Sequence, residues 1–135
     1  MFVTLFIGIL NTANGKICYT NAGHNPPLLI SNGNDPEFVA GTGSTALGIN
    51  VDSTFSSAWL SLQYEDVLFL YTDGVTEARN KNNAFFTEER LLQEVAEHAR
   101  DPLEKLVTTI LHNVKQFSKG AAQADDITIL ALKKF

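Results

Sequence analysis

The run 67–72, VLFLYT, constrains the fold more than any other feature, because it is nearly continuous in large apolar residues. A strand of this composition is buried on both faces, so it lies in the middle of a sheet that other layers cover. The chain of 135 residues is long enough to bury one core of this kind but not two. The sequence therefore predicts a single domain, residues 1–135, built around this strand.

The first half of the chain alternates short apolar or β-branched runs with turn residues, which is typical of an antiparallel sheet. The pattern predicts strands at 2–10, 17–21, 28–30, 37–40 and 54–62. Asn14 and Gly15 predict a two-residue turn between the first two strands. In the run 54–62, Ala58 and Leu60 alternate with Trp59, so we expect this strand to be buried on one face only.

The second half of the chain changes to a helical period. Apolar residues recur at helical spacing over 91–99, and Thr87 is a suitable N-cap for this first helix. We expect a second helix to begin at Pro102, with Asp101 as its N-cap. The β-branched run 127–132, ITILAL, predicts a closing strand. These elements predict an α+β fold, in which helices cover antiparallel sheets.

Carboxylates stand at opposite ends of the central strand and the last strand. Asp73 follows the run 67–72, whereas Asp125 and Asp126 precede the run 127–132. If the two strands are antiparallel neighbours, these acids meet at one end of the sheet, on backbones about 4.8 Å apart. Converging carboxylates favour a shared cation, and hard oxygen ligands favour Mg²⁺ or Mn²⁺.

A simpler interpretation of the same residues stays open at this point. An aspartate followed by glycine, as in Asp73-Gly74, is a common turn, and Asp125 and Asp126 are also explained as solvated residues before a strand. The pattern alone does not choose between a turn and a metal site.

Composition bears on nucleic-acid binding, on the cellular compartment and on membrane insertion. Lys and Arg number 10 against 15 acidic residues, and the net charge of -5 disfavours nucleic-acid binding. The one cysteine, Cys18, cannot form an internal disulfide, which predicts a cytoplasmic protein. The apolar N-terminus, MFVTLFIGIL, is far shorter than the roughly 20 residues that span a bilayer, so it predicts a strand and no membrane segment.

Six segments of the chain carry a resemblance to a known family. They are MFVTLFIGILN, YTNAGHNPPLL, ALGI, DVLFLYTDGVTEARN, FTEERLL and QADDITILAL. In this order they resemble the PP2C-like (PPM) metal-dependent protein serine/threonine phosphatases, in the bacterial branch that is similar to stage-two-sporulation protein E. The most specific segments are NAGHNPP and YTDGVTEA, and the resemblance covers nearly the whole chain.

The resemblance implies a four-layer α-β-β-α sandwich with a dinuclear Mn²⁺ or Mg²⁺ centre. In the family, these ions activate a water molecule that attacks phosphoserine or phosphothreonine directly. Asp73 and Asp125 match metal-ligating aspartates of the family's motifs. Gly74 and Asp126 match neighbouring positions that support the ligands.

Histidines are weaker candidates. His24, in AGHNPP, matches a position near the family's metal site, where it could contact the substrate phosphate. The alternative is a turn histidine that hydrogen bonds to backbone ahead of Pro26. We expect His98 and His112, on the predicted helices, to be surface residues with no acidic or histidine partner at metal-ligand spacing.

The resemblance extends only to the C-terminal portion of the family's catalytic domain, so the N-terminal portion is expected to be missing. Two aspartates, Asp73 and Asp125, are too few to hold two divalent cations tightly. This chain alone is therefore expected to bind Mn²⁺ weakly and to have little phosphatase activity. Apolar surface that the missing portion would cover is expected to favour self-association.

The resemblance makes an enzyme the first functional hypothesis. It implies a protein-serine/threonine phosphatase that is the output module of a bacterial signalling protein, with a phosphoserine on a STAS-type anti-sigma factor antagonist as substrate. An alternative is a non-catalytic binding or regulatory module with the phosphatase fold. A third possibility is a structural α+β domain in which Asp73 and Asp125 are turn residues.

Overall fold

The computed structural model describes residues 1–32, 34–123 and 125–135. Its elements in chain order are β1 (Leu5–Leu10), β2 (Lys16–Ala22), β3 (Leu28–Ile30), β4 (Glu37–Phe38), β5 (Ala58–Ser61), β6 (Val67–Tyr71), α1 (Asp73–Thr76), α2 (Glu88–His98), α3 (Leu103–Phe117) and β7 (Ile129–Lys133). The strands form two antiparallel sheets, ordered β1-β2-β5 and β4-β3-β6-β7. The predicted α+β class is confirmed.

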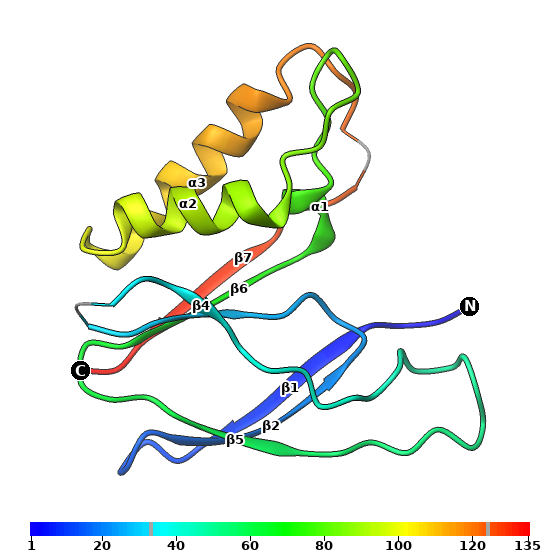
Figure 1. Cartoon of the computed structure of the whole chain (residues 1–135), viewed down its shortest axis with the longest axis vertical. Helices are drawn as coiled ribbons and strands as arrows, with labels where there is room; N and C mark the ends of the chain where they lie inside the picture. Colours follow the sequence, from blue (N-terminus) through cyan, green and yellow to red (C-terminus); the bar gives the residue numbers. More distant parts are fainter. Residues whose placement is uncertain (33, 124) are drawn as a thin grey trace.

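Helices cover only one side of this pair of sheets. In Figure 1, α2 and α3 lie on one side of the β4-β3-β6-β7 sheet, and the β1-β2-β5 sheet lies on its other side. The described residues therefore form three of the four layers that the sequence resemblance implies. Within this part of the chain, no helix has the length and apolarity that a membrane crossing requires.

The run 67–72 forms the central strand, as predicted. β6 pairs with β3 on one side and with β7 on the other, and both pairings are antiparallel. Phe69 and Tyr71 belong to the core beneath the helices, whereas Leu68 packs in the core between the two sheets. Because side chains alternate along a strand, β6 contributes to both cores, which explains why almost all of its residues are apolar.

Large apolar residues of the helices close the core beneath them. Phe86, Leu91 and Ile110 are buried there with Phe69. The Phe86 and Phe117 rings pack edge to face, with their centroids 5.4 Å apart. Thr87 is the N-cap of α2, as predicted, and its side chain accepts a hydrogen bond from the backbone N–H of Arg90 at 3.4 Å.

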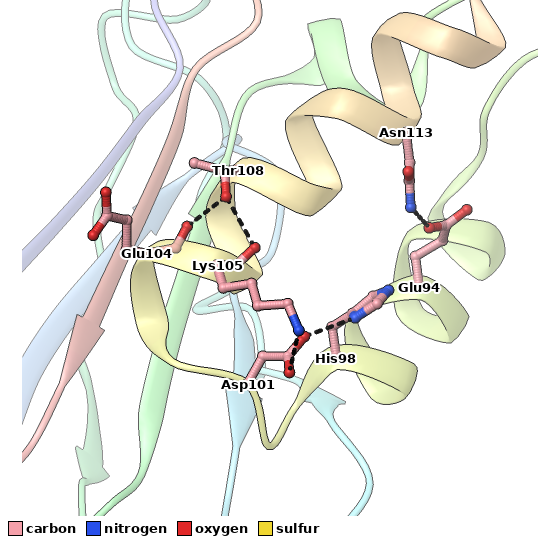
Figure 2. A network of polar contacts seen from close by, with 7 residues as sticks. All are labelled: Glu94, His98, Asp101, Glu104, Lys105, Thr108 and Asn113. Carbon is pink, nitrogen blue, oxygen red and sulfur yellow. Dashed lines mark hydrogen bonds and ion pairs between the residues drawn. The ribbon is translucent and has the colours of Figure 1, made fainter.

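Polar contacts join the ends of α2 and α3 (Figure 2). Asp101 accepts hydrogen bonds from Lys105 Nζ at 3.1 Å and pairs with His98 Nδ1 at 3.0 Å. The predictions for Asp101 and His98 were therefore wrong. The N-cap of α3 is Pro102, whose side chain has no polar atom to make a cap hydrogen bond, and the Asp101 carboxylate is instead engaged by His98 on α2 and Lys105 on α3. Glu94 on α2 accepts a hydrogen bond from Asn113 on α3.

Turn and strand boundaries differ in detail from the prediction. β4 has two residues and β5 has four, so both are shorter than the apolar runs that predicted them.

The first hairpin has a longer connection than the predicted two-residue turn. It covers residues 11–15, and the Gly15 N–H donates to Asn11 O at 2.8 Å. Gly15 has a φ of 74°, whereas the side chain of Asn14 accepts from the Lys16 N–H. A type I′ turn requires positive φ at both central residues, and only Gly15 meets this requirement.

The outward face of the β1-β2-β5 sheet is apolar and exposed. Ile9 pairs with Cys18, and Cys18 pairs with Trp59, so these three residues form one row across the sheet. Ile9 is 76% exposed and Trp59 is 71% exposed, whereas Cys18 is partly buried. Leu5 and Ile7 are exposed on the same strand as Ile9. We call these five residues the bare face.

Candidate functional site

Asp73, Asp125 and Asp126 lie where β6 ends and β7 begins. The pairing of the two strands finishes at Tyr71 opposite Ile129, so the acids leave the sheet at the same end. Asp73 is the first residue of α1, a short helix that the sequence did not predict. The antiparallel pairing on which the predicted site depends is confirmed. We call Asp73, Gly74, Asp125 and Asp126 the acidic edge.

Thr72, for which the sequence predicts no role, holds the two sides of the acidic edge together. The Thr72 hydroxyl donates to the carbonyl oxygen of Asp126 at 2.9 Å and accepts from the N–H of Thr128 at 3.0 Å. The Thr72 N–H also donates to Thr128 O at 3.1 Å. One residue therefore fixes the spacing between the Asp73 segment and the Asp126 segment. Its only signal in the sequence is a hydroxyl residue at the end of an apolar strand.

Gly74 is required by close packing within the acidic edge. A Cβ atom at this position would lie 2.3 Å from the carbonyl oxygen of Asp126 and 3.3 Å from that of Asp125. A distance of 2.3 Å is far below van der Waals contact, so no larger residue fits without a shift of the backbone. The lack of a side chain at residue 74 thus lets the two segments approach each other.

The aspartates of the acidic edge are exposed to solvent. Asp125 Oδ1 accepts a hydrogen bond from the Asp126 N–H at 2.7 Å, which orients this carboxylate along its own loop. The carbonyl oxygen of Asp125 accepts from Gln123 Nε2 at 2.9 Å. The second carboxylate oxygen of Asp125 is not needed for these local contacts.

The acidic edge fits a hard cation in its chemistry but supplies few ligands. Asp73 and Asp125 offer carboxylate oxygens, which Mg²⁺ and Mn²⁺ prefer. Among the residues described, no group of three or more His, Cys, Asp and Glu side chains is arranged to hold a metal ion. A two-ion centre would therefore need ligands in addition to this group.

His24 occupies the turn between β2 and β3. Its backbone is held by Asn21, which donates to His24 O at 2.9 Å and accepts from the His24 N–H at 2.8 Å. The ring Nδ1 lies 3.2 Å from the Thr4 hydroxyl. Because Leu28 pairs with Phe69, the segment before β3 approaches the end of the sheet where β6 finishes. A contact between His24 and substrate phosphate stays a prediction.

The other two histidines lie away from this turn. His112 is exposed on α3, as expected. His98 pairs with Asp101 at the opposite end of α2 from Thr87. Neither histidine belongs to the acidic edge.

Comparisons with known proteins identify the family. The family model described as stage II sporulation protein E (SpoIIE) matches residues 1–135. Protein IcfG of Synechocystis is 35% identical over 98% of this chain, which spans 20% of IcfG. The phosphoserine phosphatase RsbU of Bacillus subtilis is 26% identical over 99% of this chain, which spans 39% of RsbU.

A solved structure supports the same assignment. The crystal structure of the RsbU and RsbW domains of Rv1364c from Mycobacterium tuberculosis matches with a TM-score of 0.82 and 27% identity, over 97% of this chain and 36% of that chain. The two antiparallel sheets and their helical cover thus have counterparts in the fold of that structure. The chain belongs to the SpoIIE family of PP2C-like phosphatase domains.

Proposed function

We propose that Asp73 and Asp125 contribute to the metal centre of a protein-serine phosphatase domain. The observation that carries this proposal is the antiparallel β6–β7 pairing, which brings the strand ends bearing the two aspartates together. Thr72 supports it by tying the segments to each other through its hydroxyl. Gly74 and Asp126 shape the edge, because the Asp126 carbonyl packs where a side chain at residue 74 would stand.

The metal we propose is Mn²⁺ or Mg²⁺, with two ions in the complete centre. Such ions, when bound, lower the pKa of a coordinated water and neutralise charge on the phosphoryl group. The roles of this chain's residues are to bind the ions through Asp73 and Asp125 and to hold the two segments at a constant spacing. Further oxygen ligands must come from other residues of the polypeptide, because two carboxylates hold strongly hydrated cations weakly.

The substrate class we propose is phosphoserine on a protein. Similarity to the phosphoserine phosphatase RsbU supports this class. The finer proposal is that the substrate is a STAS-type anti-sigma factor antagonist and that the chain belongs to the output module of a bacterial signalling protein. The chain spans less than half of RsbU, so the activity of the whole polypeptide is part of the proposal.

The test compares three aspartate variants in the longest natural polypeptide that contains this chain. We expect Asp73→Asn and Asp125→Asn each to lower Mn²⁺-dependent hydrolysis of a phosphoserine peptide by at least about a hundredfold, as for loss of an electrostatic catalytic group. The control is Asp52→Asn, which changes an exposed loop aspartate that does not belong to the acidic edge. Equal activity of all three variants would refute the proposed site.

A second candidate is a binding module that keeps the fold without catalysis. The absence of a cluster of three or more metal-ligand side chains among the described residues favours it. Calorimetric titration of the longest natural polypeptide with Mn²⁺ separates the two candidates. Binding of two ions that depends on Asp73 and Asp125 supports the phosphatase, whereas no binding together with no turnover supports the binding module.

A further inference from the structure

A small pocket lies beside Asp125 at the acidic edge. Its volume is about 120 Å³, and its wall includes Gly74, Asp125 and Arg79. Pockets that enclose a whole small-molecule ligand are typically about 300–1,000 Å³. This pocket is therefore suited to a single chemical group of a larger ligand and not to a complete small molecule.

We propose that Arg79 binds the phosphate group of the substrate in this pocket. The inference rests on the proposed phosphatase function and adds a substrate-binding residue to it. Arg79 lines the same pocket as Asp125, which we propose as a metal ligand. An arginine is suited to this role because its planar guanidinium presents paired N–H donors to phosphate oxygens.

A tight hairpin holds Arg79 in place. Arg79 and Phe85 form an antiparallel bridge, and the Asn80 N–H donates to Ala84 O at 3.0 Å. The next hydrogen bond joins the Phe86 N–H to Ala78 O at 2.9 Å. Asn80 also accepts from the N–H of Ala84 through its side chain, which closes the loop. The backbone that carries Arg79 is thus ordered before a ligand arrives, and this lowers the entropy cost of binding.

The guanidinium of Arg79 is oriented but not neutralised. Its Cζ lies 4.7 Å from the centroid of the Phe85 ring. Stacking uses the face of the guanidinium and leaves its N–H groups available at the rim. The ion pairs found in the described part of the chain involve other basic residues. Arg79 is exposed, so a ligand can reach it.

The carboxylates around the pocket repel a phosphate group, so phosphate binding there requires positive charge. Glu77 and Asp125 line the same pocket, and Asp73 and Asp126 lie at the same end of the β6–β7 pair. These carboxylates repel a phosphate dianion, and the chain as a whole carries a net charge of -5. Metal ions bound by Asp73 and Asp125 would offset part of this repulsion. Arg79 supplies positive charge within the same pocket as Glu77 and Asp125.

A purely structural role for Arg79 predicts different behaviour. If the side chain only packs on Phe85, its replacement changes stability but not affinity for phosphate. Substrate binding predicts that KM rises, that kcat changes little, and that inorganic phosphate inhibits less. The metal requirement should stay the same, because Arg79 does not bind the ions.

The decisive experiment measures binding without turnover. The longest natural polypeptide containing this chain, with saturating Mn²⁺, is titrated calorimetrically with a peptide carrying a non-hydrolysable phosphonate analogue of phosphoserine. We expect Arg79→Gln to weaken binding by about tenfold or more, as for loss of a hydrogen bond to a charged group, and Arg79→Lys to restore part of it. The matched control is Arg100→Gln, which removes an exposed arginine that lines a different pocket.

The kinetic arm uses the same variants and the phosphoserine peptide itself. For Arg79→Gln we expect KM and the inhibition constant of inorganic phosphate to rise by similar factors, with an unchanged half-saturating Mn²⁺ concentration. Unchanged affinity for both phosphonate peptide and phosphate would overturn the role of Arg79. If binding depends on Arg79 but neither parent nor variant hydrolyses the peptide, the phosphatase proposal fails while phosphate recognition stands. If the parent does not bind the phosphonate peptide at all, the inference is wrong.

Discussion

The two sheets of the molecule are covered to different extents. The β4-β3-β6-β7 sheet has helices on one face and the other sheet on its second face, so β6 is buried on both sides (Figure 1). The β1-β2-β5 sheet packs one face against its partner and leaves the bare face exposed. Yet β1, with the sequence LFIGIL, is almost as apolar as β6. Apolar composition therefore predicts that a strand needs cover, but not that the cover lies within these residues.

The candidate site lies on the more fully covered sheet. The acidic edge stands where β6, which is buried on both faces, ends beside β7, whose Ile129 and Ala131 pack against the core beneath the helices. A binding site needs its groups at constant spacing, and a well-packed scaffold provides this. The bare face instead offers a surface on which another layer or molecule can pack.

The largest expected effect contrasts the cores of the two sheets. Phe69→Ala on β6 should lower the free energy of unfolding by about 3–5 kcal/mol, because it leaves a cavity in a fully buried site. Ile9→Ala on the bare face should change it by less than about 0.5 kcal/mol, because Ile9 is already exposed. Urea titration followed by circular dichroism measures both values. Similar losses for the two variants would contradict the contrast between covered and uncovered sheets.

The bare face should also govern self-association of the chain. We expect the parent to associate as its concentration rises, and Ile9→Lys to weaken this association by about tenfold or more, since one buried isoleucine contributes about 1.5–3 kcal/mol. Gln93→Lys, an exposed change on α2, should have no such effect. Light scattering across a concentration series gives the measurement. A parent that stays monomeric at high concentration would show that the bare face does not drive association.

A smaller effect is expected at the acidic edge. Gly74→Ala should destabilise the protein by about 1–3 kcal/mol, because the added Cβ would lie 2.3 Å from Asp126 O and force the two segments apart. Gly41→Ala is the control, since a Cβ there has no neighbour within 4 Å. Urea unfolding of both variants tests the difference. Equal free energies of unfolding would mean that the backbone at Asp126 can shift without destabilising the protein.

A buried tyrosine in each sheet gives a further contrast between the two sheets. Tyr19 in β2 donates its hydroxyl to Ala40 O at 2.8 Å, so Tyr19→Phe should cost about 1 kcal/mol. The Tyr71 hydroxyl in β6 is buried without a hydrogen-bond partner among the described residues, so Tyr71→Phe should be neutral or stabilise by up to about 1 kcal/mol. Burial raises the pKa of Tyr71, and the nearby Glu88 carboxylate raises it further. Chemical denaturation of the two variants should give opposite or clearly unequal shifts.

The smallest expected effect concerns the contact between α2 and α3. His98 and then Lys105 lower the pKa of Asp101, so its contribution to stability is present above the ordinary pKa of an aspartate. This contribution is lost as the pH falls through the lowered value. Asp101→Asn should therefore flatten the acid side of a plot of melting temperature against pH, whereas Asp52→Asn should leave its slope unchanged. A parallel curve for Asp101→Asn would rule out this pairing in solution (Figure 2).

Most of the fold could be predicted from local patterns in the sequence. The helical periodicity and the Thr87 cap located α2, and the apolar run 67–72 identified the central strand. The α1 helix escaped prediction because its four residues are too few to show a period. Asp101 was misassigned because an aspartate before a helix usually caps it, whereas here its carboxylate bonds to His98 and Lys105.

The candidate site was predictable in its acids but not in its supports. Asp73 and Asp125 could be proposed because strand polarity brings their ends together. Thr72 and Arg79 were missed, because the roles we propose for them depend on contacts with partners distant in the sequence or folded around a hairpin. Neither a hydroxyl nor an arginine has a local pattern that reveals such a partner.

By itself, the sequence determined where the long helices and most strands lie and which strand must be buried on both faces, since these properties depend on the spacing of apolar side chains along the chain. It also determined that acids stand at the ends of two strands. Only the tertiary structure decided that these ends meet, that Thr72 and Gly74 set their spacing, and that the outward side of β1 is uncovered. The physical reason is that periodicity is a local property, whereas a close approach between residues 74 and 126 depends on how every layer packs.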